Sequence, residues 1–277
     1  MSGSIDTQIP TFSWTAKTDP GRVRRNNEDA FLSLMFNHEE LVYLGRLGEA
    51  PREGWQFIFA VSDGMGGANA GEFASRIAVQ TITELVSREF HQKRGDQHPS
   101  PEELLAIFFQ SVHVKTRKTG FGYSECTGMG ATLSLCWFVE NRVHVGHIGD
   151  SRIYHFPKGN GMHQLTEDHT RVGRMRREGL LNEREARTSP YKHQLERSLG
   201  SHPDPVEPQI KTLDFQEGDR FVLCTDGITD GLWDHSVEKI ITTPPPYLMD
   251  LCPAERLIRE AKDSSGRDNL TAMVIES

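Results

Sequence analysis

The sequence predicts an α+β fold in which largely antiparallel sheets form layers with helices on the outside. One observation is that about ten apolar or alternating segments follow one another through short turns, as antiparallel strands do. A second observation is that about four main helical segments fall into two sequential blocks between the strands. A third is that an acidic residue recurs where a predicted strand ends, which indicates a shared site at one edge of the sheets.

Strands are expected where apolar residues alternate or run together between turn residues. They cover residues 12–17, 30–36, 41–44, 56–62, 131–139, 142–148, 151–156, 162–165, 206–214, 220–224 and 270–276. Helices are expected at 68–90, from Ser100 onward, and at 171–178, 182–186, 236–242 and 253–262. Ser100 and Glu103 match a capping box around Pro101. The apolar stripe of the 68–90 helix is Phe73, Ile77, Ala78, Ile82, Leu85 and Val86.

Length and charge limit what kind of protein this is. At 277 residues the chain is near the upper limit for one core, so we expect a flexible tail at 1–11, one domain at 12–277 and a flap at about 170–195. The net charge of −8 argues against a general nucleic-acid or anionic-membrane binder. We find no apolar run that could span a bilayer and no signal-peptide pattern, so we expect a cytoplasmic protein. Without heptads or long apolar patches, we expect a monomer.

The cysteines and histidines carry no metal-binding or nucleophilic pattern. Cys126, Cys136, Cys224 and Cys252 form no CxxC pair, and we expect buried free thiols in a reducing compartment. Thr132 and Asp230 stand six residues after Cys126 and Cys224, so neither of these cysteines begins a Cys-x5-Arg phosphatase loop, and the 12 histidines include no HExxH. Zinc chemistry and a cysteine-based covalent mechanism are therefore not expected.

The stretch from Trp55 to Gly71 organises the rest of the chain. It reads WQFIFAVSDGMGGANAG, in which a buried strand runs into an acidic glycine turn and then a helix. Asp63 is thereby fixed at the end of a rigid element, and Gly64 lets its own carbonyl approach a ligand. Taken alone, an ordinary Asp-Gly turn explains this stretch better.

The same arrangement recurs along the chain, and the recurrence changes the interpretation. Apolar strands meet acid-bearing turns or loops at Asp63, Asp150, Asp226 and Asp268, and Glu28 and Asp29 form a fifth acidic site. Each acid taken separately is better explained as a turn residue, an Asx cap or a solvated charge. Gathered at one edge, they would repel one another unless cations lay between them. Oxygen ligands favour Mg²⁺ or Mn²⁺, and two such ions roughly 4 Å apart would turn a bridging water into a nucleophile.

Arg24, four residues before Glu28, has two equally good interpretations. A guanidinium beside a carboxylate-held metal pair would anchor phosphate, because its fork matches two phosphate oxygens. A surface arginine in a basic cluster with Arg22 and Arg25 accounts for the same spacing.

Eight short motifs stand in a recognisable order between about Phe12 and Ile275. They are GRVRRNNED (21–29), VSDGMGG (61–67), GMGATL (128–133), HIGDSRIY (147–154), LTEDHT (165–170), ERSLG (196–200), CTDGITD (224–230) and GRDNLTAMVI (266–275). In this order they resemble the metal-dependent serine/threonine protein phosphatases of type 2C, and most of all their compact bacterial branch. Each motif is modestly specific, whereas eight in the same order are very specific.

The resemblance implies a β-sandwich of two mainly antiparallel sheets flanked by helices, a four-layer αββα arrangement with a metal cleft at one end. It implies two divalent cations, Mn²⁺ or Mg²⁺, and a weaker third. Asp63 would bridge the two ions, and Gly64 would add its carbonyl. Asp226 and Asp268 would complete the shell of one ion, and Asp29 would serve the other.

The resemblance also assigns the remaining motif residues. Glu28 would act on the second ion through water, and Asp150 with Asp226 would hold the weaker third ion. Arg24 matches the phosphate-contacting arginine. Residues 170–195 match the flap beside the cleft, whose arginines would either attract acidic phosphopeptides or form an ordinary solvated helix face.

Two features depart from the family pattern. Met65 stands where animal members carry a histidine proposed as the general acid, so the proton donor to the leaving group is unassigned. The segment 37–54 is longer than the compact pattern needs, and a family-specific hairpin and a partner surface are both open explanations.

The expected activity is hydrolysis of phosphoserine and phosphothreonine on proteins, opposing serine/threonine kinases, by a metal-bridging hydroxide. Three alternatives are a degenerate relative that only binds phosphoproteins, a calcium-stabilised β-protein, and a two-metal phosphoesterase acting on nucleic acid or nucleotides. The complete set of matched acids argues against the first, and their spread along the chain against the second. The acidic net charge argues against the third.

Overall fold

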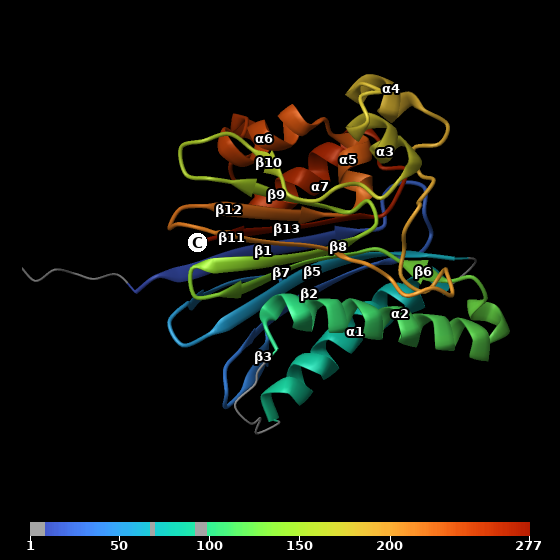
Figure 1. The fold of residues 1–277 in the computed structure, drawn as a ribbon. Coiled ribbons are helices and arrows are strands. Elements are labelled where there is room, and N and C mark those ends of the chain that lie inside the picture. Colours follow the sequence, from blue (N-terminus) through green and yellow to red (C-terminus); the bar gives the residue numbers. More distant parts are fainter. Residues whose placement is uncertain (1–8, 67–69, 92–98) are drawn as a thin grey trace, which may run out of the picture.

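The computed structural model describes residues 9–66, 70–91 and 99–277. Two antiparallel sheets pack face to face, and helices cover the outer face of each (Figure 1). The predicted α+β class, with a β-sandwich flanked by helices, is confirmed. The predicted tail at 1–11 lies mostly outside the described residues, and its last residue, Thr11, begins strand β1.

The first sheet has six strands in the order β10-β9-β12-β13-β1-β4. They are β1 (Thr11–Asp19), β4 (Leu47–Pro51), β9 (Arg152–Phe156), β10 (His163–Gln164), β12 (Arg220–Cys224) and β13 (Leu270–Glu276). Strand β1 pairs antiparallel with β13, so this sheet joins the two ends of the described chain.

The second sheet follows the order β11-β8-β7-β5-β2-β3, and β6 pairs with the end of β5. Its strands are β2 (Asp29–Phe36), β3 (Leu41–Tyr43), β5 (Gln56–Met65), β6 (Gly130–Ala131), β7 (Leu133–Val139), β8 (Arg142–Ile148) and β11 (Gln209–Asp214). Strand β5 lies between β2 and β7, and its residues from Phe57 to Val61 are fully buried. Burial on both faces explains why the sequence of β5 is continuously apolar and does not alternate.

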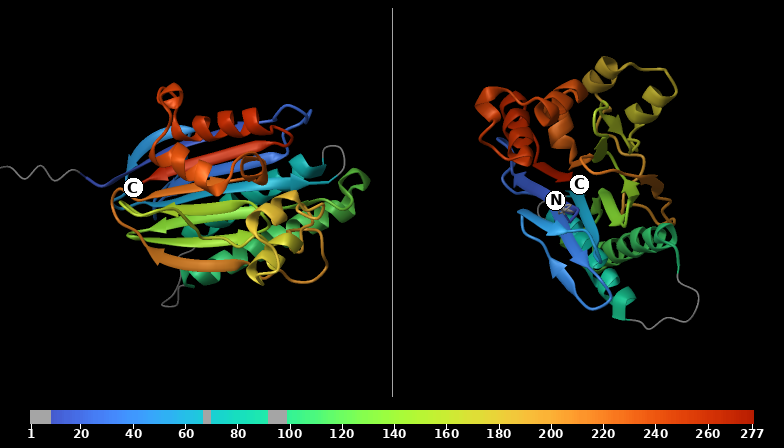
Figure 2. Two further views of the ribbon diagram at one scale, coloured as in Figure 1. Left: turned by 90° about the horizontal axis from the view of Figure 1, so that it is seen from above. Right: turned by 90° about the vertical axis from the view of Figure 1, so that its left-hand side faces the viewer.

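The helices form two outer layers (Figures 1 and 2). Helices α1 (Ala70–His91) and α2 (Pro101–Gly122) cover the seven-stranded sheet, while α5 (Asp226–Gly231), α6 (Asp234–Thr242) and α7 (Pro253–Ser264) cover the six-stranded sheet. Two short helices, α3 (Arg171–Arg177) and α4 (Glu183–Thr188), lie at one end of the sandwich. Helix α2 begins with the capping box of Ser100 and Glu103, as predicted.

Apolar clusters hold the layers together. Between the sheets, the ring of Phe12 lies 5.1 Å from that of Phe57 and 4.7 Å from that of Phe138. Burying one such side chain stabilises the fold by about 1.5–3 kcal/mol. Separate clusters join each sheet to its own helices. The four cysteines are free thiols, and three of them are buried, as expected.

Several local predictions were wrong. Strand β5 continues through Asp63 to Met65, where a turn was expected, because Asp63 pairs with Asp29 and Gly64 pairs with β6. Tertiary pairing also adds strand β4 within the segment 37–54. Helix α5 begins at Asp226, where a turn was expected. Phe73 is 53% exposed, so it does not belong to the buried stripe of α1, whose predicted start at residue 68 lies outside the described residues.

Candidate active site

The carboxylates come together at the end of the sandwich where β2 begins and β5 ends. Asp29, the first residue of β2, lies opposite Asp63 of β5 in the antiparallel register. Asp226 begins α5 directly after β12, and Asp268 stands two residues before β13. Asp150 lies in the junction between β8 and β9. Residues from both sheets and from five points along the chain therefore share one half-buried end.

These acids strongly affect one another. The pKa of Asp63 is well above its usual range, first because the carboxyl is buried and then because Asp29 and Asp226 place like charges beside it. Burial and the neighbouring Asp226 raise the pKa of Asp150 in the same way. Burial raises the pKa of Asp29 to about 7, although hydrogen bonds from Thr271 and Thr225 act in the opposite direction. The group is therefore a set of desolvated acids that raise one another's pKa values.

Two oxygens in this group fit a cation site. Oδ2 of Asp29 accepts a hydrogen bond from Thr225 Oγ1 at 2.8 Å. Oδ1 of Asp29 and Oδ1 of Asp226 are buried and have no hydrogen-bond partner among the described residues. Buried carboxylate oxygens without donors are costly unless a cation compensates them. Hard oxygen ligands suit Mg²⁺ and Mn²⁺, so the residues present fit the divalent cations that the sequence implied.

Gly64 is required by packing at this place. A Cβ on Gly64 would lie 1.8 Å from the carbonyl oxygen of Gly71 and 2.9 Å from that of Glu28. Any other residue would therefore push β5 away from α1 and from the Glu28 segment. The carboxyl of Glu28 lies beside Gly71, and burial raises its pKa while Arg24 lowers it.

Basic side chains form ion pairs with two of these acids, Asp268 and Asp226. Arg24 Nη2 lies 2.8 Å from Asp268 Oδ2. His193 lies between two acids, with Nδ1 3.4 Å from Asp226 Oδ2 and Nε2 3.4 Å from Asp230 Oδ2. Within the described part of the chain, no three carboxylate, histidine or cysteine side chains adopt a ready metal-binding geometry. The carboxylates are therefore gathered and electrostatically coupled, without a preformed ligand geometry among the described residues.

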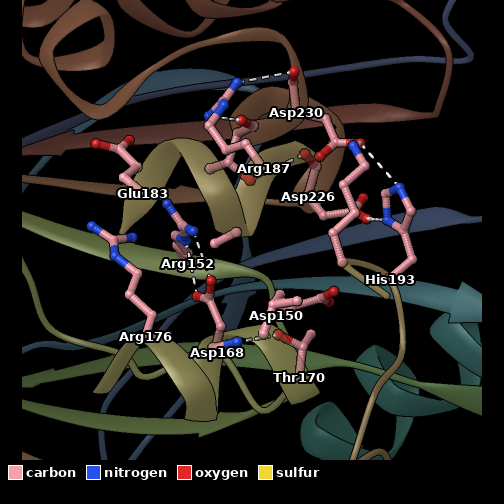
Figure 3. Close-up of a pocket in the computed structure, with 15 residues that line it drawn as sticks. Asp150, Arg152, Asp168, Thr170, Arg176, Glu183, Arg187, His193, Asp226 and Asp230 are labelled. Atoms are coloured by element: carbon pink, nitrogen blue, oxygen red, sulfur yellow. Dashed lines mark hydrogen bonds and ion pairs between the residues drawn. The ribbon is translucent and has the colours of Figure 1, made fainter. Parts of the chain in front are cut away.

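A second group of charges beside the carboxylates escaped the sequence analysis. Arg152 donates to both oxygens of Asp168, from Nε at 2.9 Å and from Nη2 at 2.6 Å. Arg152 Nη1 also donates to Asp234 Oδ1 at 3.0 Å, which the Tyr154 hydroxyl contacts as well. Figure 3 shows Arg152 and Asp168 facing each other in a cleft that Asp150, Asp226 and the flap helices also line. The motifs HIGDSRIY and LTEDHT contained Arg152 and Asp168, whereas no sequence signal marked Asp234 or His193.

The arginines of the flap (residues 170–195) are largely neutralised. Arg174 pairs with Glu178 and Glu196, and Arg177 Nε lies 3.2 Å from Glu167 Oε2. Arg171 stacks on Tyr191 at 4.7 Å. The sequence left open whether these arginines attract acidic phosphopeptides or form an ordinary solvated helix face, and their pairing with neighbouring acids fits the second explanation better.

A two-sheet sandwich with desolvated carboxylates at one end defines a class of protein that binds divalent cations through oxygen ligands. The sequence matches the family described as Protein phosphatase 2C over residues 49–262. It is 31% identical over 258 residues to protein phosphatase PhpP of Streptococcus pneumoniae, covering 93% of this chain and 94% of that protein. It is also 31% identical over 266 residues to serine/threonine protein phosphatase PstP of Mycobacterium tuberculosis, covering 95% of this chain and 44% of that protein.

Solved structures agree with the sequence matches. The crystal structure of the PstP catalytic domain in complex with two manganese ions is 29% identical, has a TM-score of 0.73, and is matched over 96% of this chain and 98% of that chain. The serine/threonine phosphatase of S. agalactiae is 27% identical with a TM-score of 0.77, over 96% of this chain and 99% of that chain. This chain belongs to the protein phosphatase 2C family, whose members are metal-dependent serine/threonine protein phosphatases. The motif resemblance is thereby confirmed.

Proposed function

We propose that this chain removes phosphate from phosphoserine and phosphothreonine in proteins with the carboxylate end described above, opposing serine/threonine kinases. The observation that carries the proposal is the set of buried acids around Asp63, where Asp29, Asp226, Asp150 and Asp268 place like charges beside its carboxyl. Two divalent cations, Mn²⁺ or Mg²⁺, would relieve that repulsion. When bound, such ions lower the pKa of water and neutralise phosphate oxygens.

Each of these acids can be assigned to one of the two proposed cations. Asp63 lies centrally, since its pKa responds to Asp29, Asp226, Asp150 and Asp268, and we assign it the bridging role. Asp226 and Asp268 would hold one ion, and Gly64 would add its carbonyl beside the bridging Asp63. Asp29 and, through water, Glu28 would hold the other. The partnerless Oδ1 atoms of Asp29 and Asp226 support this division, and Asp150 with Asp226 would hold a weaker third ion.

Arg24 is the proposed phosphate anchor. Its side chain is 49% exposed at the mouth of the site and is held by Asp268 through one nitrogen, Nη2. The rest of the guanidinium fork is therefore available to two phosphate oxygens. Met65, next to this site at the end of β5, has no proton to give, and we assign no residue as the general acid.

We extend the proposal to the setting of the enzyme. We propose one catalytic domain at 12–277 with the flap at 170–195, acting as a monomer in the cytoplasm on phosphorylated proteins and not on nucleic acid or membranes. The acidic net charge of −8 supports the exclusion of nucleic acid. In the described ranges, no helix has the length and apolar character that crossing a bilayer requires.

The test is phosphate release from a phosphothreonine peptide, measured with Mn²⁺ and then after addition of excess chelator. Release is expected with Mn²⁺ and should stop in chelator. Turnover that persists in chelator would contradict the metal-dependent mechanism. Binding of the phosphopeptide without release would favour the degenerate, binding-only relative.

A further inference from the structure

Arg187 attaches helix α4 of the flap to the core. Arg187 Nη1 donates to the carbonyl oxygens of Thr229 at 2.6 Å and Leu232 at 2.9 Å, and Nη2 donates to that of Asp230 at 3.1 Å. The guanidinium carbon also lies 4.3 Å from the ring centre of Trp233. We call this set of contacts the Arg187 clamp.

The clamp acts on the C-terminal end of α5. The last carbonyls of a helix have no partner within the helix, and a cation placed there satisfies them and interacts favourably with the helix dipole. Three hydrogen bonds from one planar side chain, together with ring stacking, fix its orientation more firmly than a single ion pair would. The residues on both sides of the contact, Arg187 and Trp233, are only partly exposed.

The clamp connects the flap to an element that bears a carboxylate of the site. Helix α5 begins at Asp226 and ends at Gly231, so one short helix carries the carboxylate at its first residue and the clamp at its last turn. Figure 3 shows Arg187 reaching from the flap helix toward the segment of Asp230, above the cleft that Asp150 and Asp226 line. The clamp therefore joins the flap to α5 on the flap side of the cleft, next to the ion pairs of Lys192 with Asp230 and of His193 with Asp226.

We propose that Arg187 is a positioning residue that holds the flap as a fixed wall of the cleft and thereby favours protein substrates over small phosphate esters. A peptide is long enough to contact both the carboxylate end and the flap, whereas a small aryl phosphate needs only the carboxylate end. If the flap is already held in place, less conformational entropy is lost when a peptide binds against it, so the peptide binds more tightly. A small ester does not contact the flap, and its binding is not affected. This inference rests on the proposed function.

The experiment compares kcat and KM of Arg187→Ala with those of the wild type on a phosphothreonine peptide and on p-nitrophenyl phosphate, both with Mn²⁺. For the peptide, KM is expected to rise roughly tenfold, as for loss of one hydrogen bond to a charged group, with kcat little changed. For p-nitrophenyl phosphate, both constants should stay within about twofold. Backbone hydrogen exchange in residues 171–188 should become faster, which shows that the wall has been released.

Two further variants test the same inference if Arg187→Ala fails to fold. Arg187→Lys keeps the charge and one hydrogen bond and should recover part of the peptide KM, and Trp233→Leu should shift it in the same direction as Arg187→Ala but less. Arg184→Ala is the matched control, because Arg184 lies on the same helix, is exposed, and should behave as wild type.

Equal losses on the peptide and the small ester would overturn the inference, because the clamp would then act on Asp226 and not on the substrate wall. An unchanged peptide KM in Arg187→Ala would overturn it as well. If the wild type hydrolyses neither substrate, the proposed function itself fails, which is a distinguishable result.

Discussion

Two groups of aspartates lie at the same end of the sandwich, and the pKa values of Asp29, Asp63 and Asp150 in the first move in the opposite direction to that of Asp168 in the second. In the group of Asp29, Asp63 and Asp150, burial and neighbouring like charges raise the pKa values. Asp168 is also buried, and burial alone would raise its pKa, but the ion pair and hydrogen bonds from Arg152 outweigh that effect and lower it. The first group is therefore suited to bind a cation from solution, whereas in the second group the guanidinium of Arg152 already supplies the positive charge.

The comparison teaches that burial does not by itself mark a functional acid. Asp168 and Asp234 are compensated by Arg152 and hold β9, the 165–170 segment and α6 together. Asp29 and Asp226 each keep a buried oxygen without a partner in the described structure. The distinction between a structural and a ligand-binding carboxylate lies in what the neighbouring elements supply.

The strongest test of the uncompensated group is Asp63→Asn. It should reduce phosphate release at least about 10³-fold, because the bridging carboxylate is lost. The metal-free variant should melt at the same temperature as the wild type or higher, since one of several repelling charges is gone. Asp250→Asn is the control, because Asp250 is exposed on the connection between α6 and α7. Full activity in Asp63→Asn would remove Asp63 from the proposed metal pair.

Removing the cation from the compensated group should instead affect stability. Arg152→Met removes the two close ion pairs that Arg152 makes with Asp168 and Asp234, and the free energy of unfolding in urea should fall by about 3–5 kcal/mol. Arg142→Met is the matched control, because its pair with Asp214 is exposed, with side-chain exposures of 66% and 83%, and should cost about 0–1 kcal/mol. If both variants lose equally little, the two aspartate groups do not differ as described.

A pH titration of the metal-free protein should separate the groups further. The folded pKa of Asp29, about 7, lies above its ordinary value of 3.8, so the folded protein binds a proton between these values that the unfolded chain does not. The resulting stabilisation is fully present below about pH 4 and is lost as pH rises through about 7, a change of about 2 kcal/mol after allowance for partial solvation. Thermal unfolding in chelator measures it, and Asp29→Asn should flatten the profile. A stability that rises from pH 5 to pH 8 in chelator would contradict the assignment.

The smallest expected effect concerns Arg24, a half-exposed side chain that pairs with Asp268 beside the first group. Arg24→Ala should raise KM for the phosphothreonine peptide about tenfold with a smaller change in kcat, because a guanidinium–phosphate contact is lost. Arg25→Ala removes a neighbouring exposed charge and should leave KM unchanged. An unaltered KM in Arg24→Ala would leave Arg24 as a surface residue paired with Asp268.

The sequence could predict the acidic residues as well as the order and class of most elements, because their signals are local. The alternation of β1, the apolar run of β5 and the capping box of α2 each depend on residues close together in the chain. The recurrence of Asp after apolar strands likewise required no knowledge of the fold. The boundaries of β5 and α5 were wrong because pairing with β2 and β6, and packing against α7 and β13, extend these elements beyond their local signals.

By itself, the sequence indicated layered, largely antiparallel α+β sheets with carboxylates at strand ends, and the resemblance of its motifs implied the β-sandwich. Only the tertiary structure decided which carboxylates lack a cation, because Arg152 is separated from Asp234 by 82 residues and Arg24 from Asp268 by 244. It also decided that Arg187 meets the end of α5, 42 to 45 residues away. The physical reason is that charge compensation depends on distance in space, which short-range sequence patterns do not specify.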